Sequence, residues 1–244
     1  MTAEPHLPLS EAMLRPVRGH HPFEACVEQL ATAIRLGVYP QGSTLPPERE
    51  LSERLVVSRA TLREAIAALR EAGLVETRRG RGGGTVVTLK PRTPGARKGA
   101  KTTAAQRASW LDALDFRRIV EPGAARQAAA TDLSDRQRAQ LASAHEVVAA
   151  ARSRAQHRQA DSRFHLTIAA LTGSPRVIDA VTSVQASLHE MLNAIPVLET
   201  NIAHSDRQHR DLCKAILDGR PDRAREVMEE HCDDTAALLR GLVA

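Results

Sequence analysis

A stretch between Arg78 and Lys101 divides this chain of 244 residues more sharply than any other feature of its sequence. It begins RRGRGGG and later reads KPRTPGARKGAK, so glycine, proline and positive charge dominate it. Such a composition cannot bury much apolar surface and is typical of a flexible loop followed by a linker. We therefore predict two domains, each long enough to form its own core. The expected segments are a tail at residues 1–20, a first domain at 21–90, a linker at 91–105 and a second domain at 106–244.

Positive charge is concentrated in the first part of the chain. Residues 1–100 contain 15 of the 34 Lys and Arg residues but only 10 of the 29 Asp and Glu residues, so they account for the whole formal net charge of +5. The remaining residues carry equal numbers of both signs. A basic half beside a neutral half indicates that the first half meets a polyanion and the second does not.

The sequence argues against several classes of protein. No run approaches the roughly 18 consecutive apolar residues of a membrane span, and the first residues, MTAEPHLPLSEAM, lack the basic and then apolar order of a signal peptide. Cys26, Cys213 and Cys232 are widely spaced and form no CxxC pair, which argues against a disulfide framework and a zinc finger. We expect a cytoplasmic protein that does not enter a membrane.

The first domain is predicted to contain three helices and a β-hairpin. Apolar residues recur with a helical period over residues 22–36 and stop at Gly37. A second helix is expected to open at Pro46-Pro47-Glu48, and a third to begin at the N-cap Ser58 and end at Gly73. The segments LVETR and TVVTL then alternate like two short strands. The predicted order is helix, helix, turn, helix, hairpin.

The second domain is predicted to be an all-α antiparallel bundle, which makes the whole chain mostly α. Ala, Leu, Arg, Glu and Gln dominate from Gln106 to the C-terminus. Helix breaks are expected at residues 131–135, 173–175, 196 and 219–221. We expect about six or seven helices with short connections.

The third predicted helix carries side chains suited to reading DNA. The second helix of a helix-turn-helix enters the major groove, so long hydrogen-bond donors are required early in it. In SRATLR, Arg59 and Arg63 are four residues apart and share one helix face, whereas Leu62 turns toward the core. Arg49, near the start of the preceding helix, is placed to clamp a phosphate.

The loop between the two predicted strands adds further donors. Arg78, Arg79 and Arg81 are placed to enter the minor groove or to contact the phosphate backbone. The neighbouring glycines, among them Gly80, allow the loop to approach DNA closely.

The segment LPPERELSERLVVSRATLREAIAALREAGLVETRRGRGGGTVV resembles, almost position for position, the winged helix-turn-helix of the GntR family of bacterial regulators. The resemblance implies DNA contacts by the arginine of the ERxL segment, by the SRxxxR residues and by the wing-tip glycine. Ala60 departs from the hydroxyl or larger residue often found there, and the wing is richer in glycine than usual. The implied DNA-contacting residues are Arg49, Arg59, Thr61, Arg63 and Gly80.

One aspartate and three histidines in the second domain have the spacing of a metal site. Asp161 and His165 are four residues apart on one face of a predicted helix, so both can bind one ion. His209 and His231 lie equally far from the centre of the turn at residues 219–221. If the flanking helices fold back antiparallel, these histidines face each other at a similar height. The donor set suits Zn²⁺ first, with Ni²⁺ or Mn²⁺ as alternatives, and leaves coordination positions open.

These positions also resemble the ligand set of the FCD domain, the helical C-terminal domain of the FadR subfamily of GntR regulators. The resemblance covers residues 106–240 approximately, with DSRFH supplying the aspartate and the first histidine. FRRIVEPGAARQAAA is similar to the first long helix of that domain, which implies that Arg117 faces the effector pocket.

We therefore predict a transcription regulator that binds double-stranded operator DNA as a homodimer, typically as a repressor in this family. A small carboxylate metabolite is expected to bind the metal and Arg117 and thereby to control operator affinity. A metal-dependent hydrolase is a rival hypothesis, but no general base accompanies the ligands and the basic half would be unexplained. A structural nucleoid-type binder would leave the ligand set without a purpose. We expect no enzymatic activity.

Overall fold

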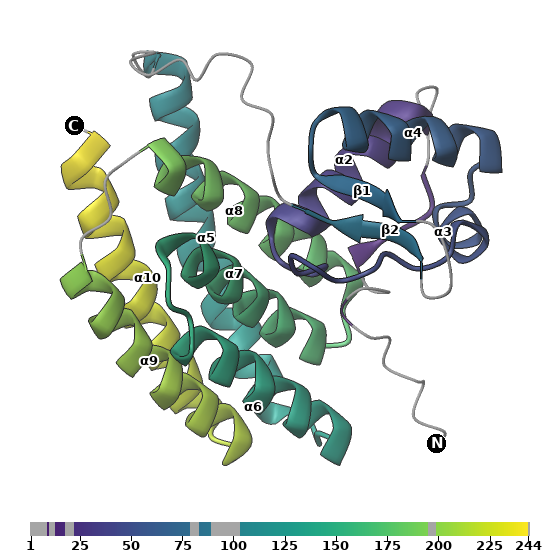
Figure 1. Cartoon of the computed structure of the whole chain (residues 1–244). Coiled ribbons are helices and arrows are strands. Elements are labelled where there is room, and N and C mark those ends of the chain that lie inside the picture. Colours follow the sequence, from purple (N-terminus) through teal and green to yellow (C-terminus); the bar gives the residue numbers. More distant parts are fainter. Residues whose placement is uncertain are drawn as a thin grey trace. The chain divides into compact units, whose positions relative to one another are not determined.

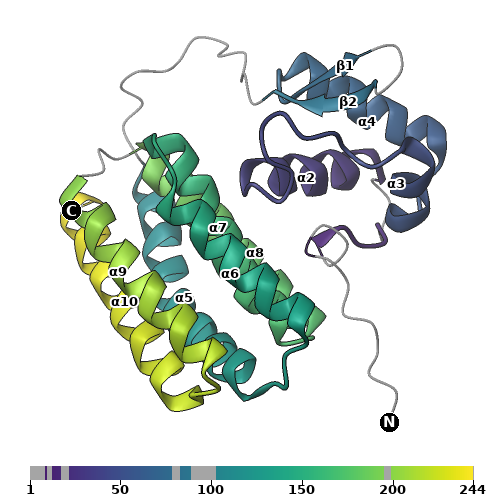
Figure 2. The ribbon, with the colours of Figure 1, turned by 60° about the horizontal axis from the view of Figure 1, so that its bottom comes forward.

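The computed structural model describes Leu9 and residues 13–17, 22–78, 83–88, 103–194 and 199–243. The chain divides into two compact units, Met1–Ala100 and Lys101–Ala244. Each unit buries its own set of apolar side chains. Figures 1 and 2 show the first unit in purple to blue and the second in teal to yellow.

The N-terminal unit contains three helices and a two-stranded hairpin within its described residues. Helix α4 packs against α2, α3 and β1, and Leu30, Leu51 and Leu62 are fully buried in this unit. The predicted order of elements, and with it the winged helix-turn-helix, is confirmed. The elements are α2 (Pro22–Arg35), α3 (Glu48–Leu55), α4 (Arg59–Glu71), β1 (Val75–Arg78) and β2 (Gly84–Val87).

Two cap residues define the turn between α3 and α4. Val56 ends α3 in the left-handed conformation, with φ 53°, and donates its backbone N–H to the carbonyl of Ser52. Ser58 begins α4, because its Oγ accepts the backbone N–H of Thr61 at 3.0 Å. Such a hydroxyl pairs with one of the amides that the first helical turn leaves free. The turn is therefore only three residues long.

The hairpin forms the wing of this unit. Strands β1 and β2 pair antiparallel, with Arg78 opposite Gly84 at the loop end. Thr44 forms an isolated bridge to Val86, and further backbone hydrogen bonds flank this bridge. An isolated two-stranded hairpin is marginally stable, so this third extended segment supports the wing.

The C-terminal unit is a bundle of six helices within the described residues. Its first long helix, α5, contacts α7, α8, α9 and α10 and is the centre of the bundle. Helices joined by short turns run in opposite directions, as α9 and α10 do in Figures 1 and 2, and the predicted antiparallel bundle is confirmed. The helices are α5 (Ala104–Ala130), α6 (Asp135–Ala149), α7 (Arg154–Leu171), α8 (Pro175–Ala194), α9 (Glu199–Leu217) and α10 (Pro221–Val243).

One break between helices was missed by the sequence analysis. The predicted breaks near residues 131, 173 and 219 separate helices, and position 196 lies outside the described residues. A further break separates Ala149 from Arg154, where Ser153 Oγ accepts the backbone N–H of Gln156 at 3.2 Å and caps α7. This break gives α7 an N-terminus of its own.

Apolar clusters hold the bundle together. Phe164 belongs to the larger cluster, and its ring centroid lies 5.1 Å from that of His209. Trp110 belongs to a second cluster with Met191 and Leu239. Among the described helices, none combines the length and apolar character needed to cross a membrane.

Candidate DNA interface and metal centre

The N-terminal end of α4 presents the arginines that were predicted to read DNA. Arg59 and Arg63 are both exposed, and Leu62 between them is fully buried. Thr61 is half-buried, and its Oγ1 lies 2.8 Å from Ser58 Oγ. Thr61 therefore also belongs to the capping arrangement that begins the helix.

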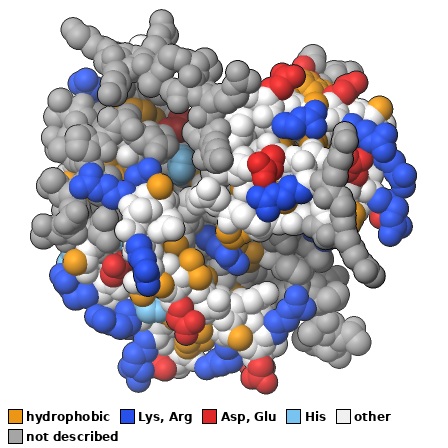
Figure 3. Space-filling model, in the orientation of Figure 1, with side chains coloured by type: hydrophobic (Ala, Val, Ile, Leu, Met, Phe, Trp, Pro, Cys, Tyr) orange, Lys and Arg blue, Asp and Glu red, His pale blue; other side chains and the backbone are white. Residues whose placement is uncertain are grey.

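Exposed ion pairs hold two of the predicted DNA-binding arginines. Arg63 Nε lies 2.9 Å from Glu48 Oε2, and Arg49 Nη1 lies 3.6 Å from Glu53 Oε1. Exposed pairs of this kind contribute little free energy, so a phosphate can replace the carboxylate. Figure 3 shows Lys and Arg side chains gathered at the edge of this unit where Figure 1 places α3 and the start of α4.

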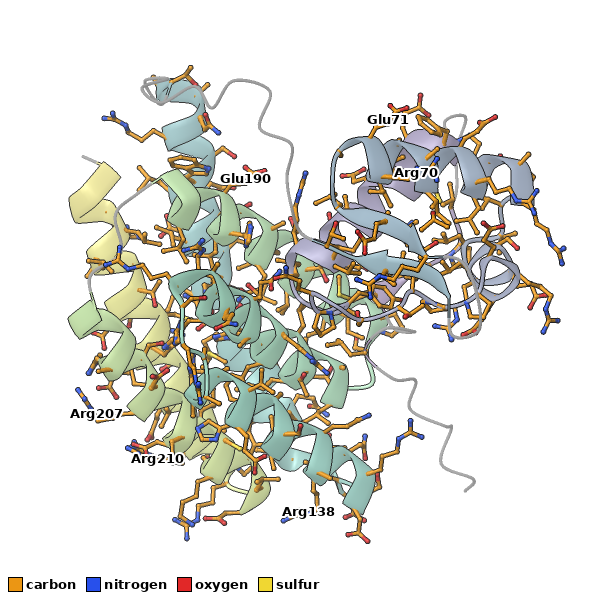
Figure 4. All side chains as sticks on the ribbon, viewed as in Figure 1. Arg70, Glu71, Arg138, Glu190, Arg207 and Arg210 are labelled. Carbon is orange, nitrogen blue, oxygen red and sulfur yellow. The ribbon has the colours of Figure 1, made fainter. Side chains whose placement is uncertain are left out.

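The predicted contacts of the wing tip lie outside the described residues. This applies to Arg79 and Gly80, while Arg78, the last residue of β1, pairs with Glu76 at 2.7 Å. Arg70 lies in the last turn of α4, which begins at Arg59, and Figure 4 labels it near Glu71. Arg70 is therefore a suitable reference residue for the α4 surface.

Three helices bring the four predicted metal ligands together. Asp161 and His165 come from α7, His209 from α9 and His231 from α10. One ligand atom from each residue can be chosen so that all four lie within 4.8 Å of one another. The histidines are almost fully buried, whereas the Asp161 side chain keeps 20% of its surface exposed.

The donor atoms fit a divalent transition metal. His209 Nε2 lies 3.3 Å from Asp161 Oδ1, and two ligands each about 2.0–2.1 Å from one ion are roughly 3.0–3.4 Å apart. Nε2 of His209 thus faces the carboxylate, while its buried Nδ1 has no hydrogen-bond partner among the described residues. One carboxylate and three imidazoles form a borderline donor set, so these residues could hold such an ion.

Glu121, which the sequence analysis did not single out, orients two of the site residues. Its Oε2 accepts a hydrogen bond from Arg117 Nε at 2.9 Å and lies 2.9 Å from His165 Nδ1. Its Oε1 accepts a hydrogen bond from Gln185 Nε2. Burial alone would raise the pKa of Glu121, but Arg117 and His165 hold it well below its usual range. A charged Glu121 thus faces Nδ1 of His165 and leaves Nε2 on the side of Arg117, whose Nη2 lies 3.4 Å away.

A second chain of polar contacts begins at His231. Its Nδ1 lies 3.1 Å from Gln208 Oε1, and Gln208 Nε2 donates to Asp234 Oδ2 at 2.7 Å. Asp234 also pairs with His204 at 2.8 Å, and Arg207 lies 3.1 Å from His204. Partners on the outer nitrogen of a ligand histidine fix its ring orientation, so Gln208 directs Nε2 of His231 toward the cluster.

Protonation in the cluster suits metal binding. Burial, the largest effect, lowers the pKa of His209 to about 3. Burial also lowers the pKa of His231 well below its usual value, and His209 and Arg117 add to this shift. Burial opposes ionisation of Asp161, but His209 and His165 bring its pKa below the usual value. Neutral imidazoles and an ionised carboxylate are the forms that bind metals.

The cluster borders a cavity of about 550 Å³. Arg117, Asp161 and His231 are part of its wall, so Arg117 lies beside two of the candidate metal ligands. His157, His189 and His204, whose spacing does not distinguish them in the sequence, also line the cavity. Cys213, by contrast, packs within the apolar core.

Family models match both units. The model for bacterial regulatory proteins of the gntR family matches residues 23–87, and the FCD domain model matches residues 112–234. The chain belongs to the GntR family. This GntR-family protein is a DNA-binding transcription regulator with an FCD effector-binding domain, and it is not an enzyme.

Relatives of this GntR-family protein include both an activator and a repressor. It is 33% identical to the HTH-type transcriptional regulator RmpR of Mycobacterium gastri, over 85% of this chain and 76% of that protein. It is 28% identical to the Glc operon transcriptional activator of Escherichia coli K12, over 85% of both chains. It is 29% identical to the transcriptional repressor NanR of Klebsiella aerogenes, over 93% of this chain and 89% of that protein.

Proposed function

We propose that this GntR-family protein is a homodimeric repressor whose operator affinity is controlled by a small organic acid bound at a metal centre. The observation that carries this proposal is the convergence of four ligand atoms within 4.8 Å beside a cavity that Arg117 lines. A buried cluster of this kind is not needed for packing, and it lies in a chain whose other unit is a winged helix. We propose the cytoplasm as its location.

Asp161, His165, His209 and His231 would hold the metal, with Zn²⁺ as the first choice and Ni²⁺ or Mn²⁺ as alternatives. A bound ion would supply positive charge and open coordination positions for a carboxylate. Arg117 faces His165 Nε2 at 3.4 Å, and an arginine can only donate hydrogen bonds. When that nitrogen serves as a ligand instead, the Arg117 N–H is available to the effector carboxylate as a charge-assisted donor.

On the DNA side, we propose that Arg59, Thr61 and Arg63 meet the major groove and that Arg49 contacts a phosphate. For the wing, we propose contacts by Arg79 and Gly80. Two such winged helices in a homodimer would bind the two halves of a pseudopalindrome, and their linkage would make the dimer bind more tightly than one domain alone. An effector that favours a different spacing of these helices lowers operator affinity by the difference in its affinity for the two states.

The test is a gel-shift assay on operator fragments selected from a random duplex library. We expect retention of the fragment by the metal-loaded protein and its release by an organic acid that binds the cavity. Treatment with a chelator should abolish the response to the acid. Retention that no acid changes, with or without metal, would contradict the proposal, and a reporter assay separates repression from activation.

Metal binding is tested with His209→Ala. Loss of one of three imidazoles should sharply reduce the bound Zn²⁺, Ni²⁺ or Mn²⁺ measured by elemental analysis. Asp161→Asn is a second, more conservative variant, and His145→Ala is the control because His145 is no part of the cluster. A full complement of metal in both ligand variants would contradict the site.

A further inference from the structure

Helix α7 carries a row of charged side chains from the metal centre toward its own N-terminus. Arg154, Arg158, Asp161 and His165 follow one another at intervals of three or four residues, which places them on one helix face. The first three line the cavity, and the fourth belongs to the ligand cluster. The row therefore leads from the candidate ligands to two arginines one turn apart.

Positive charge exceeds negative charge in the cavity wall. Four arginines line it, at positions 117, 154, 158 and 207, against two aspartates, at 161 and 234. Arg117 is paired with Glu121, and both aspartates lie beside histidines. Arg207, which extends from the outer side of α9 in Figure 4, contacts His204.

Arg154 and Arg158 differ from Arg117, which pairs with Glu121, and from Arg207, which contacts His204. In the described part of the chain, neither Arg154 nor Arg158 has an acidic partner. Arg158 is half-buried, and its Nε is enclosed without a hydrogen-bond partner among the described residues. Burial first, and Arg154 second, lower the pKa of the Arg158 guanidinium. Two like charges one helical turn apart destabilise each other, and a partly desolvated cation requires a partner. An anion in the cavity would relieve both costs.

The distance along α7 separates these arginines from the metal centre. With about 1.5 Å of rise per residue, Arg158 and Arg154 lie roughly 5 and 10 Å from Asp161 along the helix axis. Leu188, Leu192 and Leu238 also line the cavity and give it an apolar wall. A cavity of about 550 Å³ is within the roughly 300–1,000 Å³ typical of small-molecule sites.

We propose that the cavity takes an organic acid with two anionic groups separated by a short carbon chain. One carboxylate lies at the metal centre with Arg117, and the second anionic group, a carboxylate or a phosphoryl group, binds Arg154 and Arg158. This inference rests on the proposed function and deepens it, because it names the chemical class of the effector.

The test compares acids of equal length with one or two anionic ends. Glutarate and adipate are titrated against pentanoate and hexanoate into the full-length protein loaded with Zn²⁺, using calorimetry. 2-Carboxyethylphosphonate tests a phosphoryl-type end. We expect the two-ended acids to bind about tenfold or more tightly than their one-ended counterparts, as charge-assisted hydrogen bonds would provide. Equal affinity of one-ended and two-ended acids would overturn the inference and leave the proposed function standing.

Paired variants locate the second anionic group. The double variant Arg154→Gln and Arg158→Gln should lose the preference for two-ended acids and keep its affinity for pentanoate within about twofold. Arg152→Gln is the control, because Arg152 is exposed just before α7 and does not line the cavity. A preference that survives the double variant would overturn the inference.

A third arm separates this inference from the proposed function. Arg117→Gln should lower the affinity for one-ended and two-ended acids alike, and so should removal of the metal. If two-ended acids still bind with undiminished affinity and only Arg154 and Arg158 matter, the effector is not anchored at the metal, which overturns the proposed function. If no acid of either kind binds the loaded protein, both are overturned.

Discussion

At the scale of single residues, the candidate metal centre depends on side chains that are not ligands. Glu121 faces His165 Nδ1, and Gln208 faces His231 Nδ1. Each partner lies beside the outer nitrogen of a candidate ligand histidine, so it favours the ring orientation that directs Nε2 inward. Neither residue has a sequence signal of its own, because glutamate and glutamine are common on helices.

Gln208→Ala should weaken the metal site without removing a ligand. We expect about a 10- to 100-fold loss of Zn²⁺ affinity, because His231 loses the partner that orients its ring. Competition with a chromophoric chelator measures this loss. Gln127→Ala, an exposed replacement on α5, is the control, and equal affinity in both variants would count against an orienting role.

Arg63→Ala should lower operator affinity by about 1–3 kcal/mol. The side chain is 67% exposed, and its partner among the described residues is Glu48, in an exposed pair, so little stability is lost with it. Arg70→Ala is the matched control, since Arg70 is exposed at the other end of α4. Gel-shift titration on the selected operator measures both. If the two replacements lowered operator affinity equally, a contact between Arg63 and the bases would be contradicted.

At the scale of elements, short caps and turns decide where the helices stand. Val56 ends α3 at a positive φ that β-branched residues seldom adopt. The residue remains 65% exposed, so packing does not explain the choice of valine, and we find no structural reason for it. The connection from α6 to α7, by contrast, has a local explanation. Ser153 and Gln156, three residues apart, form a helix-cap pattern that can be read in the sequence.

Gly84→Ala should destabilise the wing. Gly84 has φ +150°, and a Cβ atom there would come within 2.9 Å of Thr44 Cγ2. We expect a loss of about 1–3 kcal/mol in the free energy of unfolding of the N-terminal unit. The single tyrosine, Tyr39, is buried in this unit. Its near-ultraviolet signal therefore reports the unfolding of the N-terminal unit as denaturant is added.

Gly123→Ala is the matched control for that replacement. Gly123 lies inside α5, where a Cβ atom would meet nothing within 4 Å, and alanine is favoured over glycine in a helix by about 0.5–1 kcal/mol. The single tryptophan, Trp110, reports the C-terminal unit. We expect the unfolding midpoint followed by Trp110 to move to a higher denaturant concentration. A shift to a lower concentration would contradict the absence of a steric clash at residue 123.

At the scale of the whole molecule, stability should depend on pH through the buried histidines. Burial lowers the pKa of His209 to about 3 in the folded protein, from an ordinary value of 6.5. Between these two values the unfolded chain binds a proton that the folded chain does not, so stability falls as the pH falls below 6.5. The expected slope is about 1.4 kcal/mol per pH unit for one proton.

This pH dependence is measured on chelator-treated protein as the free energy of unfolding at each pH, with Trp110 fluorescence as the signal. His209→Gln should flatten the slope, since glutamine does not titrate. A slope in the variant equal to that of the unchanged protein would show that other groups cause the acid sensitivity.

Periodicity and caps made most of the fold predictable. The helical pattern before Gly37, the cap at Ser58 and the alternation on either side of the glycine-rich loop are local signals, and they correspond to α2, α4 and the hairpin. The cluster of the four candidate metal ligands was predictable as well, because helical spacing and symmetry about one turn are also readable along the chain.

Local pattern along the chain thus determined the elements and the four candidate ligands of this GntR-family protein. Tertiary packing alone decided that Glu121 and Gln208 back the ligand histidines and that Arg154 and Arg158 share a cavity with them. The reason is physical: these contacts join residues of different helices, and their energies depend on burial and on distances across the bundle. No spacing within one helix encodes either quantity.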